Sequence, residues 1–104
     1  MANRWRGEVA LTVNGEDCVM RLSLGALAEL EDCVGSDGLL PLVERFESGG
    51  FSASDLSELL YAGLRCGGWT GSQEDLKQAY IGGGAQAAVR AAAQLLKVTF
   101  TLEP

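Results

Sequence analysis

The stretch "EVALTVNGEDCVMRL", residues 8–22, decides how this sequence begins to fold. At its centre stands Asn14-Gly15, a strong signal for a two-residue hairpin turn because both residues tolerate positive φ. With those two residues in the turn, six apolar side chains share one face: Val9, Leu11, Val13, Cys18, Met20 and Leu22. A slip of one residue would scatter them, so the register is well specified. The stretch therefore predicts an antiparallel β-hairpin with one buried face.

This register also predicts which residues oppose one another across the hairpin. The pairs are Val13–Glu16, Leu11–Cys18, Val9–Met20 and Glu8–Arg21. The last of them joins opposite charges, which is an attractive cross-strand pair. An isolated two-stranded hairpin is marginal in water. We therefore expect its apolar face to pack on the rest of the chain.

After the hairpin the apolar residues recur with a helical period. We expect five short helices, at residues 24–34, 39–47, 53–66, 73–80 and 85–97, with the last helix fraying near residue 98. In the tail, Val98, Phe100 and Leu102 also alternate as a strand would, so residues 98–102 are left open between helix end and strand. The glycine-rich stretch "IGGGAQA", residues 81–87, is interpreted as a flexible joint between helices.

Caps and apolar stripes support these helices. The expected N-caps are Ser23, Asp37, Ser52 and Ser72. Asp55 and Asp75 stand three residues after two of the serines, at the spacing of a capping box. Gly35, Gly49-Gly50 and Gly67-Gly68 are expected to end the first three helices. The expected core stripes are Ala26, Leu27, Leu30 and Val34; Leu56, Leu59, Leu60 and Leu64; and Val89, Ala92, Ala93 and Leu96.

The fold class that follows is α+β, mostly α, with an N-terminal β-hairpin followed by about five short helices. The chain has 104 residues, 47% of them hydrophobic and 21% charged, which suits one globular domain, residues 1–104. Residues 1–6 are expected to form a loose arm, residues 8–22 the hairpin and residues 24–98 the helical part. No apolar run approaches the roughly 18 residues that span a bilayer, and no signal-peptide core follows "MANRWRGEVA". The expected location is the cytoplasm.

The residue inventory argues against enzyme chemistry. The chain has no histidine, which removes the commonest general base and transition-metal ligand. Its three cysteines, Cys18, Cys33 and Cys66, form no C-x-x-C motif and are interpreted as free, mostly buried thiols. "IGGGAQA" lacks the Lys-Ser or Lys-Thr of a P-loop, and no EF-hand spacing is present. We expect no catalytic residue, no cofactor and no metal site.

The negative charge is concentrated in the middle of the chain. The net charge is −6, and residues 23–66 hold eight acids against only Arg45 and Arg65, whereas the flanking segments are neutral. Such a field repels nucleic acid and anionic membranes and attracts basic protein surfaces. The sequence therefore predicts a protein partner, with no nucleic acid and no membrane.

Three acids, Glu29, Glu31 and Asp32, stand in the second half of the helix at residues 24–34. That end already carries partial negative charge, so together they cost the helix about 0.3–1 kcal/mol. A solvated face, a handle for a basic partner and a catalytic pair are the alternatives. Catalysis needs burial that drives the two pKa values apart, which an exposed pair lacks. The candidate partner-binding residues are Glu29, Leu30, Glu31 and Asp32.

The order of segments resembles a known family. "RGEVALTVNGEDCVMRLSLGALAELEDCVG", residues 6–35, followed by "LLPLVERFESGGFSASDLSELLYAGLRCGG", residues 39–68, is similar to the small tail-assembly protein of gene transfer agents, which are phage-like particles made by bacteria. The family is similar in turn to the tail assembly chaperones of long-tailed phages. The resemblance covers about residues 6–100.

The resemblance implies a function. Such chaperones bind the long tape measure protein before the tail tube polymerises around it, and are absent from the finished particle. In many phages a longer form, made by ribosomal frameshifting, recruits tail tube subunits; this sequence matches the short form. The family is sometimes labelled tail tube protein, although tube subunits are mainly β-sheet. The alternatives are a structural tail component and an acidic regulator or DNA mimic that binds a basic protein. A homo-oligomer is left open.

Overall fold

An antiparallel hairpin opens the fold in the computed structural model, which describes residues 7–34 and 40–100. β1 (Val9–Val13) and β2 (Glu16–Met20) are joined by Asn14 and Gly15, whose φ angles of 52° and 84° are both positive. The register pairs Val9 with Met20, Leu11 with Cys18 and Val13 with Glu16, which confirms the prediction. The ladder ends at Val9–Met20, so the expected Glu8–Arg21 pair is not part of it.

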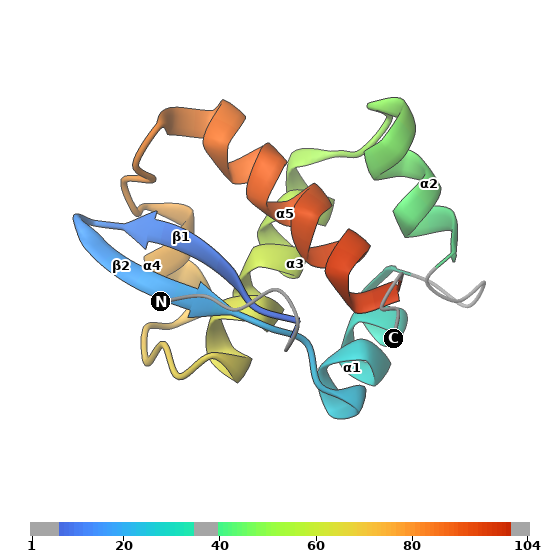
Figure 1. Ribbon diagram of the computed structural model, residues 1–104, viewed down its shortest axis with the longest axis horizontal. Helices are drawn as coiled ribbons and strands as arrows, with labels where there is room; N and C mark the ends of the chain where they lie inside the picture. The colour runs from blue at the N-terminus through green and yellow to red at the C-terminus, as the bar shows by residue number, and fades with distance from the viewer. Residues whose placement is uncertain (1–6, 35–39, 101–104) are drawn as a thin grey trace.

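Five helices follow: α1 (Leu24–Val34), α2 (Leu40–Ser48), α3 (Ala53–Cys66), α4 (Gln73–Lys77) and α5 (Gly84–Phe100). The predicted fold class, a hairpin followed by helices, is confirmed. α5 lies across α3, with the hairpin at the left of the view, α2 at the upper right and α1 at the lower right (Figure 1). α3 is central, because it contacts β2, α1, α4 and α5.

The predicted N-caps of α1, α3 and α4 form in the structure. The Ser23 hydroxyl accepts from the Ala26 N–H at 3.1 Å, and α1 has the predicted bounds. Ser52 and Asp55 form a capping box at the start of α3, which also has its predicted bounds. A second capping box, Ser72 with Asp75, begins α4. α2 ends at Ser48, one residue later than expected, whereas its predicted first residue, Leu39, the predicted cap Asp37 and the terminator Gly35 lie outside the described residues.

α4 is shorter than predicted, because the next residues pair with the hairpin. The Tyr80 N–H donates to Asn14 Oδ1 at 2.9 Å, and the Tyr80 carbonyl accepts from the Asn14 N–H at 2.7 Å. Ile81 forms an antiparallel bridge with Val13. The interpretation of "IGGGAQA" as a joint between helices is therefore wrong for Ile81, which joins the hairpin, and for residues 84–87, which belong to α5. The outer edge of β1 offers backbone N–H and C=O groups as hydrogen-bond partners. The residues after α4 could not reach these groups if the helix continued for another turn.

α5 differs from its prediction at both its end and its face. It continues to Phe100 instead of fraying near residue 98, so the strand alternative is wrong as far as residue 100. The rest of the tail lies outside the described residues. Ala93, expected in the core stripe, is exposed, and the buried face is Ala88, Ala91, Ala92, Leu95, Leu96 and Val98. α5 packs on both α3 and β1, so its buried residues face both of these elements.

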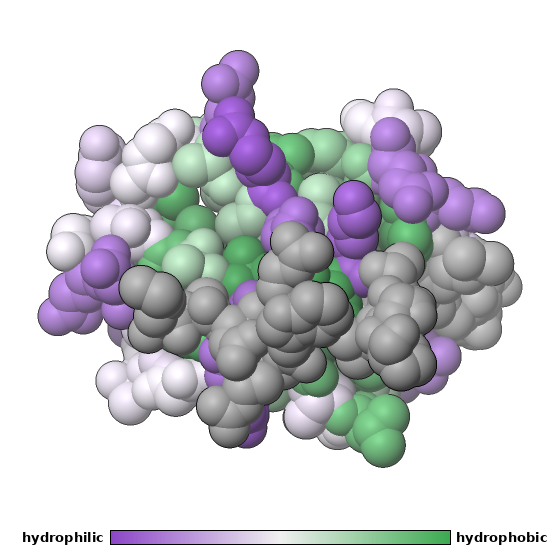
Figure 2. Space-filling view, viewed as in Figure 1, coloured by the Kyte–Doolittle hydropathy of each residue, from purple (hydrophilic) through white to green (hydrophobic). Residues whose placement is uncertain are grey.

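The core lies between the hairpin, α3 and α5. Its largest fully buried side chains are Met20, Leu30, Leu42, Leu59, Leu64, Leu95 and Val13. The predicted hairpin face packs onto this core, with Cys18 and Leu22 partly buried. Among the described residues, Leu24 and Tyr80 are the strongly exposed large hydrophobic side chains. On the face crossed by α5, hydrophobic residues are visible between protruding hydrophilic ones (Figure 2).

An ion pair ties α2 to the start of α3. Arg45 Nε lies 3.0 Å from Asp55 Oδ2, and Arg45 Nη2 lies 3.3 Å from Asp55 Oδ1. Burial alone would raise the pKa of Asp55, but hydrogen bonds from the Ser52 backbone N–H and Arg45 outweigh it and hold the pKa below its usual value. The Asp55 carboxylate therefore stabilises the fold above its unfolded pKa, and this stabilisation disappears as pH falls through the folded pKa.

We expect Asp55→Asn to reduce the loss of stability that acid causes. At pH 7 the variant should lose about 1 kcal/mol of unfolding free energy, because it gives up the ion pair and part of the capping box. Between about pH 5 and pH 2 its stability should fall less than that of the unmodified chain. Urea denaturation across this range measures both effects. Parallel pH profiles for the two proteins would contradict the assignment.

Candidate functional site

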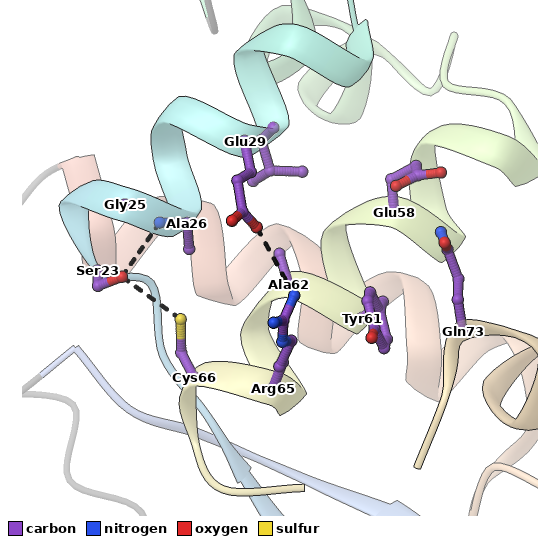
Figure 3. A pocket seen from close by; sticks show the side chains of 11 residues that line it. Ser23, Gly25, Ala26, Glu29, Glu58, Tyr61, Ala62, Arg65, Cys66 and Gln73 are labelled. Atoms are coloured by element: carbon purple, nitrogen blue, oxygen red, sulfur yellow. Dashed lines mark hydrogen bonds and ion pairs between the residues drawn. The ribbon is translucent and has the colours of Figure 1, made fainter. Parts of the chain in front are cut away.

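A groove of about 380 Å³ lies between α1 and α3 (Figure 3). Its apolar lining consists of Ala26, Leu30 and Ala62, with Gly25 beside them. Its polar lining consists of Ser23, Glu29, Glu58, Tyr61, Arg65 and Gln73. Cys66 lies at the end where Ser23 precedes α1, and Gln73, from the start of α4, lies at the other end.

Helical spacing explains how the sequence builds these walls. Glu58, Tyr61, Ala62 and Arg65 stand at positions i, i+3, i+4 and i+7, so they share one face of α3. On α1, Ala26 and Leu30 are four residues apart and belong to the buried side. Small side chains at Gly25, Ala26 and Ala62 leave space between the two helices, and this space is the groove.

One ion pair crosses the groove. Arg65 Nη1 lies 4.0 Å from Glu29 Oε1, and the two side chains are 63% and 71% exposed. Figure 3 shows Arg65 reaching from α3 and Glu29 from α1, with Glu58 farther along the same groove. An exposed pair at that distance contributes little to stability, because water and salt screen it. Two carboxylates against one guanidinium leave the lining with a net charge of −1.

The structure separates the four predicted partner-binding residues. Glu29 is exposed at the groove, whereas Leu30 lies at its base and is only 2% exposed. Glu31 and Asp32 are exposed but do not line the groove. The expected apolar contact through Leu30 therefore needs correction, because α3 packs on this part of α1 and takes Leu30 into the core. Only the three acids reach the surface.

Sequence reasoning missed the half of the groove that α3 supplies. Glu58, Tyr61 and Arg65 were not among the candidate partner-binding residues predicted from the sequence. Their i, i+3, i+7 spacing was visible and marks one helix face. The sequence held no signal that this face lies opposite Glu29, because the Glu29–Arg65 contact joins residues 36 positions apart.

The two cysteines whose side chains are described are free thiols, and the surroundings of Cys18 disfavour its thiolate. Cys18 and Cys66 are free and half-buried rather than mostly buried, and the side chain of Cys33 lies outside the description. Burial raises the pKa of the Cys18 thiol, and Glu16 and Asp17 raise it further. A raised pKa disfavours the nucleophilic thiolate. Within residues 7–34 and 40–100 no cluster of side chains is arranged to hold a metal ion, and no helix is long and apolar enough to cross a membrane.

The fold and groove define a small acidic α+β protein in which α1 and α3 border a surface groove. A family model described as phage tail tube protein, GTA-gp10, matches residues 6–101, and the chain belongs to that family. The resemblance to tail proteins of gene transfer agents is thereby confirmed at the level of the family. No curated protein and no solved structure matches the chain.

Proposed function

We propose that this chain is a tail assembly chaperone, which binds the tape measure protein while a phage-like tail is built and leaves before the particle is finished. The observation that carries the proposal is the fold. The sheet of the described residues has two strands, with Ile81 bridged to it, and the rest of the ordered structure is helix. A tube wall made mainly of β-sheet would need more strand than this. The chain would act in the cytoplasm of the producing bacterium, with tail tube subunits as a second partner.

The second candidate is a structural tail component, in the tube or in a connector. The family description, which names a tail tube protein, favours it. Either role is structural or assembly work, and we expect no hydrolytic, transferase or redox activity. An acidic regulator or DNA mimic is less well supported, because its acids would be spaced along a surface like phosphates. Here they are concentrated in residues 23–66.

The proposed docking region is the acidic surface of α1, formed by Glu29, Glu31 and Asp32. All three are exposed. Electrostatic complementarity of this kind acts mainly on the rate of association, and salt screens it. A basic segment of the partner would therefore be attracted to α1 before closer contacts form.

Co-expression with the tape measure protein tests the function. We expect the tape measure protein to be soluble and to co-purify with this chain, and we expect purified particles to lack the chain by mass spectrometry. Presence of the chain in particles, in amounts matching other tail proteins, would establish the structural role instead. In the same assay, the triple variant Glu29→Gln, Glu31→Gln, Asp32→Asn should associate more slowly and with a shallower salt dependence. It should remain at least as stable, because charge repelling the end of α1 has been removed.

A further inference from the structure

We propose that the α1–α3 groove receives one amphipathic helix of the partner, with an apolar stripe on the groove floor and an arginine or lysine paired with Glu29, while Glu58 supplies a second carboxylate farther along the groove. In the free chain Arg65 stands in for that cation. The identity of the partner rests on the proposed function, whereas the chemistry of the site rests on the groove alone.

The shape of the groove suits a helix. Two helices form its walls, and small or apolar side chains lie at its floor, where Ala62 is half-buried and accessible, whereas Ala26 and Leu30 are only 6% and 2% exposed. A helix bound in such a groove presents anchors at positions i, i+3, i+4 and i+7. Tyr61, half-buried in the α3 wall, offers an aromatic surface of the kind that dominates binding at interfaces.

The charges favour a cationic helix. Glu29 projects from α1 and Glu58 from α3 farther along the groove, so a cation at Glu29 would have a second carboxylate along the same groove (Figure 3). Glu58 is half-buried, where water screens a charge less than at the open surface. Residues 23–66, which include both walls, carry the whole net charge of −6 and extend this attraction beyond the groove.

The Arg65–Glu29 ion pair is weak enough for a cation of the partner to replace Arg65 at Glu29. Its 4.0 Å separation is longer than the 2.7–2.9 Å of a strong charge-assisted hydrogen bond, and both side chains are mostly hydrated. Breaking it therefore costs the chain little. A partner arginine could take over Glu29 while Arg65 swings into solvent. The native pair then competes with the partner, so removing Arg65 should strengthen binding.

A synthetic peptide helix tests the groove without the tape measure protein. The probe is an amphipathic helix of about fifteen residues, a length at which isolated helices begin to hold. It carries a leucine stripe flanked by arginines, and a matched peptide carries glutamates in their place. In an NMR titration of the full chain, the arginine peptide should shift amide signals along the groove faces of α1 and α3. The glutamate peptide should shift none.

Matched variants separate the groove from general charge. Glu29→Gln with Glu58→Gln should weaken peptide binding about tenfold or more, because the cation loses both carboxylates. Glu44→Gln with Glu47→Gln removes two exposed acids of α2 and should change affinity less than about twofold. Arg65→Gln should strengthen binding about threefold or more, whereas Lys77→Gln, which removes an exposed cation of α4, should have a much smaller effect.

Each other result overturns the inference. These results are no binding at millimolar peptide, shifts confined to other elements, equal losses in the α1–α3 and α2 variants, or weaker binding by Arg65→Gln. A dimer formed with rising protein concentration, and abolished by the groove variants, would mean that a second copy occupies the groove. Failure of the proposed function looks different: the peptide would bind as described, yet the tape measure protein would not co-purify. If the tape measure protein binds the groove variants normally, the function stands and the groove is wrong.

Discussion

Gly67→Ala is expected to lower the unfolding free energy by about 3 kcal/mol or more, because a methyl group at this position has no room. A Cβ on Gly67 would collide with the carbonyl oxygen of Val19 and lie 2.7 Å from its carbonyl carbon. Both atoms belong to the backbone of β2, so no side-chain rotation can relieve the overlap. The end of α3 and the strand would have to separate.

The need for glycine here is spatial and not conformational. Gly67 has φ −83° and ψ −1°, angles that any residue adopts. The close approach continues nearby, where the Arg21 N–H donates to the Gly63 carbonyl at 3.1 Å and a Cβ on Gly63 would lie 2.6 Å from Leu95 Cδ2. These two glycines let α3 lie directly against β2 and α5. They thereby fix the last turn of α3, which carries Arg65.

Urea denaturation measures the effect, with Gly25→Ala as the matched control. Gly25 is exposed in α1, and outside its chain neighbours and the helix backbone the nearest atom to an added Cβ, Ser23 Oγ, is 3.8 Å away. Alanine there should stabilise the helix by about 0.5–1 kcal/mol, since glycine is the poorer helix former. A loss below about 1 kcal/mol in Gly67→Ala would mean that α3 does not end against β2.

The hairpin, α1 and α3 could be predicted because their signals are local. Asn14-Gly15 needs only its own φ angles and the alternation around it, and Ser52 needs only Asp55 three residues on. α4 could not be bounded in this way, because its end depends on Tyr80 meeting Asn14, 66 positions earlier. The face of α5 was uncertain for another reason. Because α5 is rich in alanine, the spacing of its apolar residues does not decide whether Ala91 or Ala93 is buried.

The groove shows the same division. Glu29 was singled out from the sequence because its position in the helix is unfavourable, which is a local property. Its counterpart Arg65 was not, because the crossing of α1 over α3 is a tertiary fact. Leu30 was assigned both to the core stripe of α1 and to the partner surface. Its 2% exposure shows that it belongs to the core.

The second large effect concerns the hairpin. Leu11→Ala should lower the unfolding free energy by about 2–4 kcal/mol, the usual result of truncating a buried leucine. Leu11 is 5% exposed, on the face of β1 that belongs to the core, and β1 packs against α5. Leu24→Ala is the matched control, since Leu24 is 85% exposed and the same truncation should change stability by less than about 0.5 kcal/mol.

A small loss in Leu11→Ala would mean that the hairpin is a free arm, and the arm would then become a candidate for docking. The expected large loss has a different consequence for binding. Leu11 does not line the α1–α3 groove. The variant should therefore bind the arginine peptide with unchanged affinity at temperatures where it remains folded, and lose binding only as it melts. Reduced affinity in the folded variant would mean that the hairpin, rather than α1 and α3, determines the shape of the groove.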